Sequence, residues 1–405
     1  MTASIRIPST PELVAMVATF MALNAMGIDI MLPALPEIAA SFRVAHGNQQ
    51  QLVILVYVLS FGVAQLFYGP LSDSFGRRPV LLWSLGVYLA ATMACLIAPT
   101  FLTFLIARAV QGAAAAAARV IAVAVVRDLM AGREMARVMS MAMVVFMVVP
   151  ILAPGVGQLV LLAGPWRWTF GFLFAMAAIV IAWTWLRLPE TRPKETRVPF
   201  SFGEAMTGYG AVLQNRTALG YTIATSILFG SLFGFLATAQ QVFVDVFGLG
   251  RYFPLAFACV AGAMSIASFI NSRLVTRLGM RRISHAALIG FTLISAVHAL
   301  ILMSGVGSLW RYMGLLAPAM LMFGMIGANF SAIVMEPLGA RAGTAAAFYG
   351  FATTTFSAML GGLIGMHYDG TPAPLIFGQA CLGTAAIAIV LLTERGRLFT
   401  APSAG

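Results

Sequence analysis

The chain of 405 residues is 60% hydrophobic and only 9% charged, and its mean hydropathy is +0.94. Soluble domains carry roughly 25% charged residues, so this composition excludes an ordinary soluble fold. The net charge of +11 raises the question of a nucleic-acid partner, but the positions of the basic residues assign that charge to membrane topology instead.

The apolar segments predict an integral membrane protein built from helices alone. A membrane-spanning helix needs about 20 predominantly apolar residues. The N-terminal run has no small-residue cleavage site and continues into a full span, so it predicts a first membrane helix rather than a signal peptide. Twelve spans are expected, near residues 11–32, 51–71, 79–98, 101–126, 136–162, 168–187, 218–246, 252–274, 284–304, 311–333, 343–367 and 372–393.

The basic residues gather in alternate loops between these spans. On one side of the membrane lie 18 of the 24 lysines and arginines, and on the other only Arg43, Arg167, Arg251 and Arg311. Loops rich in Lys and Arg stay in the cytoplasm. Both termini are therefore predicted to be cytoplasmic.

Asp29 is the acidic residue that the pattern places inside a span, in the outer half of the first helix. A carboxylate inside a bilayer is costly and suggests function by default. Such a group could take up a proton on one side and release it on the other. The alternative is that Asp29 lies close to the outer interface and caps a helix broken at Pro33.

The segment 69–79 separates the second and third spans and reads Gly-Pro-Leu-Ser-Asp-Ser-Phe-Gly-Arg-Arg-Pro. Its glycines, Gly69 and Gly76, are turn formers, and Asp73 and Arg77 are charged. Such a segment is too polar for hydrocarbon and predicts a tight hairpin loop.

The fourth span contains two arginines, Arg108 and Arg119, separated by a run of alanines and Gly112. Eleven positions make about three turns plus 20°, so the two share one face and lie about 16 Å apart along the axis. Arg108 is expected near the depth of Asp29 and could pair with it. The alternatives are a static ion pair for Arg108 and, for Arg119, a side chain that extends toward the cytoplasm.

The end of the fourth span adds Asp128, on the same side of the membrane as segment 69–79. Asp73, Arg77 and Asp128 are therefore expected to cluster on the cytoplasmic face, where they could form a charge network. The alternative is a plain solvated charged surface.

The fifth span holds Pro150, Pro154 and Gly157 close together. Proline removes a backbone hydrogen bond and bends a helix. Glycine permits close packing. These residues predict a bend that could act as a hinge or a seal.

The chain is expected to divide into two halves of six helices. Residues 188–216 are rich in proline and charge and predict a cytoplasmic linker between a bundle at 1–187 and a bundle at 217–405. Residues 278–282, Leu-Gly-Met-Arg-Arg, follow the eighth span as Phe-Gly-Arg-Arg follows the second. This weak repeat favours two pseudo-symmetric halves.

Other polar residues give weaker signals. His298 lies in the ninth span, and a lone histidine there is more often a packing residue than a proton carrier. The sequence shows no phosphate-binding loop, nucleophile constellation or zinc spacing, so neither an enzyme, a nucleotide cofactor nor a metal is expected.

Together these motifs resemble the Bcr/CflA group of proton-coupled drug exporters within the major facilitator superfamily. The resemblance rests on Ile-Asp-Ile-Met-Leu-Pro at 28–33, on segment 69–79, on Arg-Ala-Val-Gln-Gly at 108–112 and on the Pro150 to Gly157 segment. It implies that Asp29 carries the proton, that Arg108 modulates it and that Pro154 and Gly157 carry the antiporter motif. It also implies gating by Asp73, Arg77 and Asp128, and a multi-pass protein of the bacterial inner membrane.

The resemblance implies proton-coupled efflux of small amphiphilic drugs, chloramphenicol-like or bicyclomycin-like, by a monomer driven by the proton gradient without a cofactor. A transporter of a sugar, a nucleoside or another metabolite remains the alternative on the same fold. A membrane enzyme or receptor has little support because no catalytic cluster is present.

Overall fold

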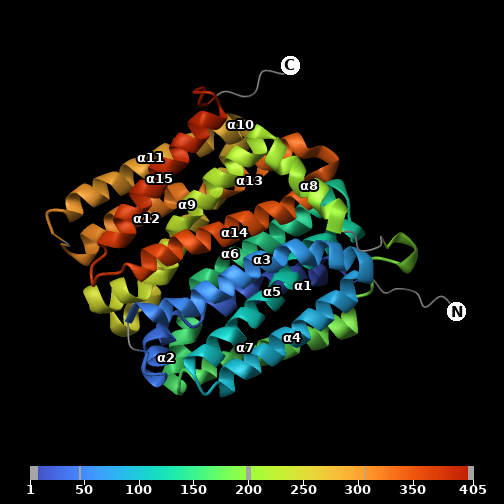
Figure 1. Cartoon of the computed structure of the whole chain (residues 1–405), viewed down its shortest axis with the longest axis horizontal. Coiled ribbons are helices and arrows are strands. Elements are labelled where there is room, and N and C mark those ends of the chain that lie inside the picture. Colours follow the sequence, from blue (N-terminus) through green and yellow to red (C-terminus); the bar gives the residue numbers. More distant parts are fainter. Residues whose placement is uncertain (1–7, 45–46, 198–201, 306, 400–405) are drawn as a thin grey trace. The chain divides into compact units, whose positions relative to one another are not determined.

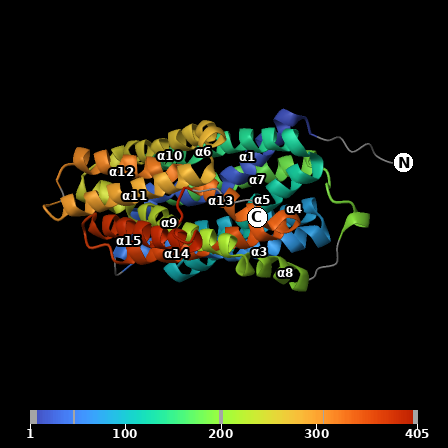
Figure 2. The same cartoon turned by 90° about the horizontal axis from the view of Figure 1, so that it is seen from above.

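The structure, a computed structural model, describes residues 8–44, 47–197, 202–305 and 307–399. All regular elements in those residues are helices, and twelve of the helical stretches found there are long and apolar enough to cross a membrane. The all-helical class and the twelve spans predicted from the sequence are thus confirmed. Figures 1 and 2 trace the helices in chain order.

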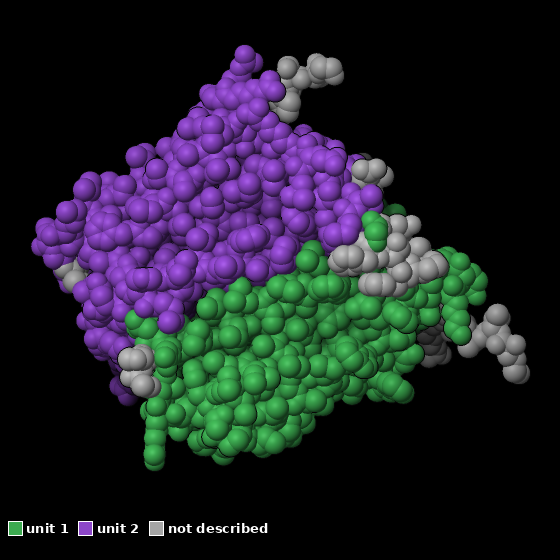
Figure 3. Space-filling model, in the orientation of Figure 1, with its two compact units in different colours: residues 1–205 green, residues 206–405 purple. Residues whose placement is uncertain are grey.

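The chain forms two compact units, residues 1–205 and 206–405 (Figure 3). The division falls inside the segment predicted as a linker, 188–216, of which residues 198–201 lie outside the described part. Helix α8 occupies its later half, at Phe202–Gln214. Each unit contains six of the twelve apolar helical stretches.

In unit 1, α5 is the central helix. The run of alanines makes it thin, and it packs against both α3 and α4. A Cβ added at Gly112 would collide with the carbonyl oxygen of Tyr57, so α3 and α5 approach backbone to backbone. The elements are α1 Thr10–Asp29, η1 Leu32–Ala34, α2 Leu35–Ser41, η2 Gly47–Gln51, α3 Leu52–Phe75, α4 Arg77–Ile97, α5 Phe101–Leu129, α6 Gly132–Ala163, α7 Arg167–Arg187 and η3 Lys194–Thr196.

In unit 2, α9 is the central helix, and it packs along α14 and α15 (Figures 1 and 2). The tenth span, predicted as one helix, is broken at Met325 and Ile326. The elements are α9 Arg216–Gln241, a π-helical turn η4 Val242–Val246, η5 Gly250–Tyr252, α10 Phe253–Leu278, α11 Met280–Leu302, α12 Leu309–Gly324, α13 Gly327–Met335, η6 Glu336–Arg341, α14 Ala342–Met366 and α15 Ala373–Thr393.

The predicted hairpin loop at 69–79 is mostly helix, and the sequence-based prediction was wrong on this point. Helix α3 continues through Gly69, Pro70 and Asp73 to Phe75, and α4 begins at Arg77. The turn is Gly76 alone, with φ +100°. A residue with a Cβ disfavours that conformation, which is why glycine is needed there.

The same turn recurs in unit 2. Gly279 separates α10 from α11 with φ +81° and ψ 155°, close to the φ +100° and ψ 153° of Gly76. The weak sequence repeat therefore corresponds to one backbone conformation used at the equivalent place in each unit.

Candidate functional site

Asp29 is the last residue of α1, where the first span changes from α-helix to the short 3-10 turn around Pro33. Proline has no backbone N–H to continue the helix. Asp29 is only 5% exposed. Within the described ranges, no side chain or backbone group forms a hydrogen bond or an ion pair with its carboxyl group. The structure thus places an unpaired acid at a break in the helix, inside unit 1.

Arg108 reaches the same region from α5 and is completely buried. Its guanidinium donates to the carbonyl oxygen of Gly27 at 3.0 Å, to that of Val53 at 3.3 Å and to Oε1 of Gln111 at 2.6 Å. It also lies 4.3 Å from the centre of the Tyr57 ring, a cation–π contact.

The ion pair between Asp29 and Arg108 suggested by the sequence is absent from these contacts. The guanidinium donates instead to neutral oxygens on three helices, so its directional bonds are used without the acid. Its link to Asp29 is indirect: Gly27, two residues before the acid, belongs to the last turn of α1. Arg108 thereby anchors that turn to α3 and α5.

Two neutral polar residues, Gln111 and Thr92, extend the hydrogen bonds of Arg108. The sequence-based prediction did not include them. Gln111 is fully buried and donates through Nε2 to Oγ1 of Thr92 at 2.7 Å. Thr92 in turn donates to the backbone oxygen of Tyr88. A signal was present, because Gln111 follows Arg108 by three residues and shares its helix face. Thr92 gave none, since a single threonine in an apolar helix is common.

The proline-containing segment of α6 packs against the break in α1. Helix α6 is continuous across Pro150 and Pro154. A Cβ at Gly157 would collide with the carbonyl oxygen of Ile30, the residue after Asp29. The residues predicted as an antiporter motif and the predicted proton carrier are therefore neighbours in space.

Gly157→Val should lower thermal stability, because the added side chain must push α1 away from α6. Overpacking of this kind costs about 1–3 kcal/mol. Gly155→Val is the matched control, since a Cβ at Gly155 meets no atom within 4 Å. Thermal unfolding of the two purified variants measures the difference, and equal melting temperatures would contradict the predicted contact.

The two remaining candidates, Arg119 and His298, do not share the buried surroundings of Asp29 and Arg108. Arg119 is exposed, in contrast to Arg108 on the same helix, and its guanidinium lies 5.9 Å from the Phe61 ring. His298 belongs to unit 2, where it is buried in α11 with its ring 5.2 Å from that of Tyr312.

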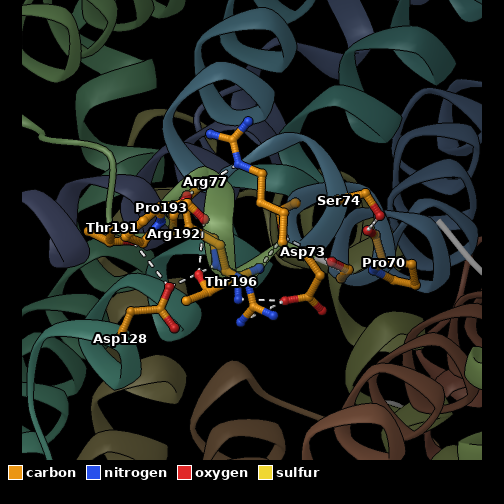
Figure 4. Close-up of polar contacts among 12 residues, drawn as sticks. Pro70, Asp73, Ser74, Arg77, Asp128, Thr191, Arg192, Pro193 and Thr196 are labelled. Carbon is orange, nitrogen blue, oxygen red and sulfur yellow. Dashed lines mark hydrogen bonds and ion pairs between the residues drawn. The ribbon is translucent and has the colours of Figure 1, made fainter. Parts of the chain in front are cut away.

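A second cluster in unit 1 surrounds Arg77 (Figure 4). Its buried guanidinium donates to Oδ1 of Asp73 at 2.7 Å, to Oδ2 of Asp128 at 2.9 Å and to Oγ of Ser72 at 2.6 Å. The predicted grouping of Asp73, Arg77 and Asp128 is present. It joins the ends of α3 and α5 to the start of α4.

The residues just after α7 extend this cluster, and the sequence reasoning had assigned them only to a linker. Oε1 of Glu190 accepts the backbone N–H of Arg77 at 2.9 Å. The Thr191 hydroxyl donates to Asp128, and Arg192 lies 3.5 Å from Asp73 (Figure 4). The first part of the predicted linker is thus bound to the Arg77 cluster.

Comparison with known proteins gives a consistent result. The family model of the Major Facilitator Superfamily matches residues 17–362. The bicyclomycin resistance protein homolog of Haemophilus influenzae is 30% identical over 390 residues, which cover 91% of this chain and 93% of that protein. Multidrug resistance protein MdtL of Shigella dysenteriae is 30% identical over 244 residues, covering 60% of this chain and 61% of that protein.

Among solved structures, the xylose transporter XylE of E. coli, in a partially occluded inward-open conformation, has a TM-score of 0.74 at 12% identity. The match covers 96% of this chain and 98% of that one. At this identity the likeness concerns the fold. The family match and the twelve apolar helices lead to one conclusion: the chain belongs to the major facilitator superfamily and is a multi-pass membrane transporter, not an enzyme.

Proposed function

We propose that this chain exports small amphiphilic drug-like compounds in exchange for protons, with Asp29 as the proton carrier. The observation that carries the proposal is the buried carboxyl group of Asp29, unpaired at a break in α1. Burying an ionised side chain at membrane depth costs about 2.5–3.5 kcal/mol or more. The free energy of this buried carboxyl group therefore depends strongly on whether it is protonated. Such a dependence is required if proton binding is to be coupled to substrate export.

Arg108 fits this proposal as the residue that positions the carrier. It binds the turn of α1 that ends at Asp29, and its charge is permanent. A substrate that disturbs the last turn of α1 would act on the acid and on the arginine together. Proton release and substrate binding would then be linked through one helix end.

The two neighbouring clusters have proposed roles in the same cycle. Gly157 packs against the backbone just after Asp29. The segment of α6 that contains Pro150, Pro154 and Gly157 would therefore be the surface along which α1 moves. The Arg77 cluster, with Asp73 and Asp128, would hold the predicted cytoplasmic end of unit 1 in one arrangement. Opening that end would require these ion pairs to rearrange.

The substrate class is inferred from relatives named for resistance to bicyclomycin or to multiple drugs. These relatives also support the bacterial inner membrane as the location, and the distribution of arginines supports cytoplasmic termini. A monomer driven by the proton gradient, without a cofactor, is the simplest working unit. With one carrier acid, export of a neutral drug would move net charge, whereas export of a monocation would not.

A substrate panel tests the proposed activity. The chain is expressed in a bacterial strain that lacks its own drug pumps, and growth is measured with chloramphenicol, bicyclomycin and other amphiphilic compounds. Increased resistance to some of these compounds, lost when the proton gradient is collapsed, is the expected result. No resistance to any of them, together with transport of a sugar or nucleoside, would replace drug export by metabolite transport.

A further inference from the structure

Unit 2 contains a buried histidine, His285 of α11, that is bonded on both sides of its ring. Nε2 lies 2.7 Å from the hydroxyl of Tyr221 on α9. Nδ1 accepts the backbone N–H of Phe399 at 3.0 Å. The second contact ties α11 to the segment that follows α15. His285 is only 1% exposed and its bond to Tyr221 is buried, whereas its bond to Phe399 is partly buried.

The hydrogen bonds around Tyr221 fix which nitrogen carries the proton. The Tyr221 hydroxyl donates its single hydrogen to Oε1 of Glu394 at 2.7 Å, so towards His285 its oxygen acts only as an acceptor. Nε2 must then carry the hydrogen, and Nδ1 offers the lone pair that accepts the Phe399 N–H. The observed contacts require neutral His285.

A second proton on His285 would affect its two sides differently. It would occupy Nδ1 and face the Phe399 N–H, donor against donor, so that bond would be lost. The Nε2 bond to Tyr221 would remain, because Nε2 is already the donor there.

The charged groups around the histidine come from three elements. Glu394, after α15, accepts from Tyr221. Arg281 of α11 donates to Glu394 at 3.1 Å and to Glu336 of η6 at 3.0 Å. The Phe330 ring of α13 packs edge-on against the Tyr221 ring. Glu394 would attract a charged His285 and Arg281 would repel it, and on the Nδ1 side the contacts are the backbone N–H and the ring of Phe399.

The segment Arg395–Phe399, here called the C-terminal latch, follows α15 and contains two residues in a left-handed conformation. Arg395 has φ +52° and Phe399 has φ +67°, left-handed conformations that residues with a Cβ disfavour. The Phe399 ring lies edge-on to His285 with centroids 5.8 Å apart. The left-handed residue Arg395 belongs to the end of α15, where the Gly396 N–H bonds the carbonyl oxygen of Leu391 at 2.8 Å, whereas Phe399 is held by its contacts with His285.

We propose that the C-terminal latch is a protonation-sensitive device: it is docked on α11 when His285 is neutral and is released when His285 takes up a second proton. Docking joins the latch to α11 at the end of unit 2 where Arg281 holds α11 to η6. Release would leave the Tyr221–Glu394–Arg281 bonds in place. If the termini are cytoplasmic, as proposed above, the latch responds to acid on the side where the exchanged protons arrive.

Spin labelling of the full-length chain tests the latch without substrate. A label is attached at Leu398→Cys after Cys259 and Cys381, the exposed cysteines, are changed to serine; Cys95 is buried. Between pH 8 and pH 5 the mobile component of the spectrum should grow. Its ratio to the immobile component should rise by up to about tenfold per pH unit, the slope for a single proton.

His285→Gln is the deciding variant, because the glutamine amide can offer an oxygen to Phe399 and an N–H to Tyr221 but does not titrate. Its label should stay immobile across the pH range. A label at Leu392→Cys, on the exposed face of α15, should show no pH effect in either background. The proposal would be overturned if the mobile fraction of the label rose equally at low pH in His285→Gln. It would also be overturned if the mobile fraction did not change with pH in the chain that retains His285. Because no substrate is present, either result leaves the proposed export untouched.

Discussion

Asp29→Asn is expected to abolish uphill export driven by a pH gradient. Asparagine keeps the size of the side chain and fits the same buried position at the end of α1, but it cannot carry a proton. The measurement is accumulation of a panel compound by proteoliposomes with an imposed pH gradient. The variant should fall to the level of protein-free vesicles, which makes this the largest effect expected for a single conservative change.

The same variant should still exchange substrate across the membrane without a gradient, because exchange needs only the conformational cycle. Glu37→Gln is the matched control, since Glu37 is an exposed acid on the short helix α2 that follows the break. It should leave gradient-driven export unchanged. Uphill export by Asp29→Asn at the normal rate would remove Asp29 from the mechanism.

Arg108→Lys is expected to lose most transport and to lower the melting temperature. A lysine carries the same charge but is a compact donor, whereas the guanidinium bridges carbonyl oxygens of Gly27 and Val53 and the side chain of Gln111. A hydrogen bond to a charged group contributes about 1.5–3 kcal/mol, and each such bond that the lysine does not form is lost. The last turn of α1, and with it Asp29, would lose its anchor.

Arg119→Lys supplies the comparison, because this arginine lies on the same helix but is exposed. It should retain both stability and transport. Thermal unfolding and proteoliposome transport, measured together, separate loss of fold from loss of coupling. If Arg108→Lys transported at a rate near that of the unmodified chain, the three hydrogen bonds of the guanidinium would not be needed for transport.

Much of the fold could be predicted from local sequence. The twelve spans follow from runs of apolar residues, because a backbone in hydrocarbon must satisfy its own hydrogen bonds as a helix. Gly76 and Gly279 were recognisable turn residues, since a positive φ there requires glycine. The cluster of Asp73, Arg77 and Asp128 was also predictable, because charges excluded from hydrocarbon gather at the same end of the helices.

Local turn signals misled where a helix continued through a proline. The Gly69-Pro70 pair indicated a turn, yet α3 continues through it. The hydroxyls of Ser72 and Ser74 bond the carbonyl oxygens of Gly69 and Pro70, and Arg77 binds Asp73 one turn further on. A proline removes only one backbone donor, the N–H that would bond the carbonyl oxygen four residues earlier, so the helix can continue through it on its other hydrogen bonds.

The composition, the periodic apolar runs and the motifs by themselves determined the class of protein, its spans and the residues worth testing, because each depends on neighbours along the chain. Only the tertiary structure decided what those residues contact. It separated Arg108 from Asp29 and gave the arginine three neutral acceptors. It brought Gly157 against the break in α1, Glu190 onto the Arg77 turn and Phe399 onto His285. These pairings join residues far apart in the chain, so their geometry depends on how the helices pack.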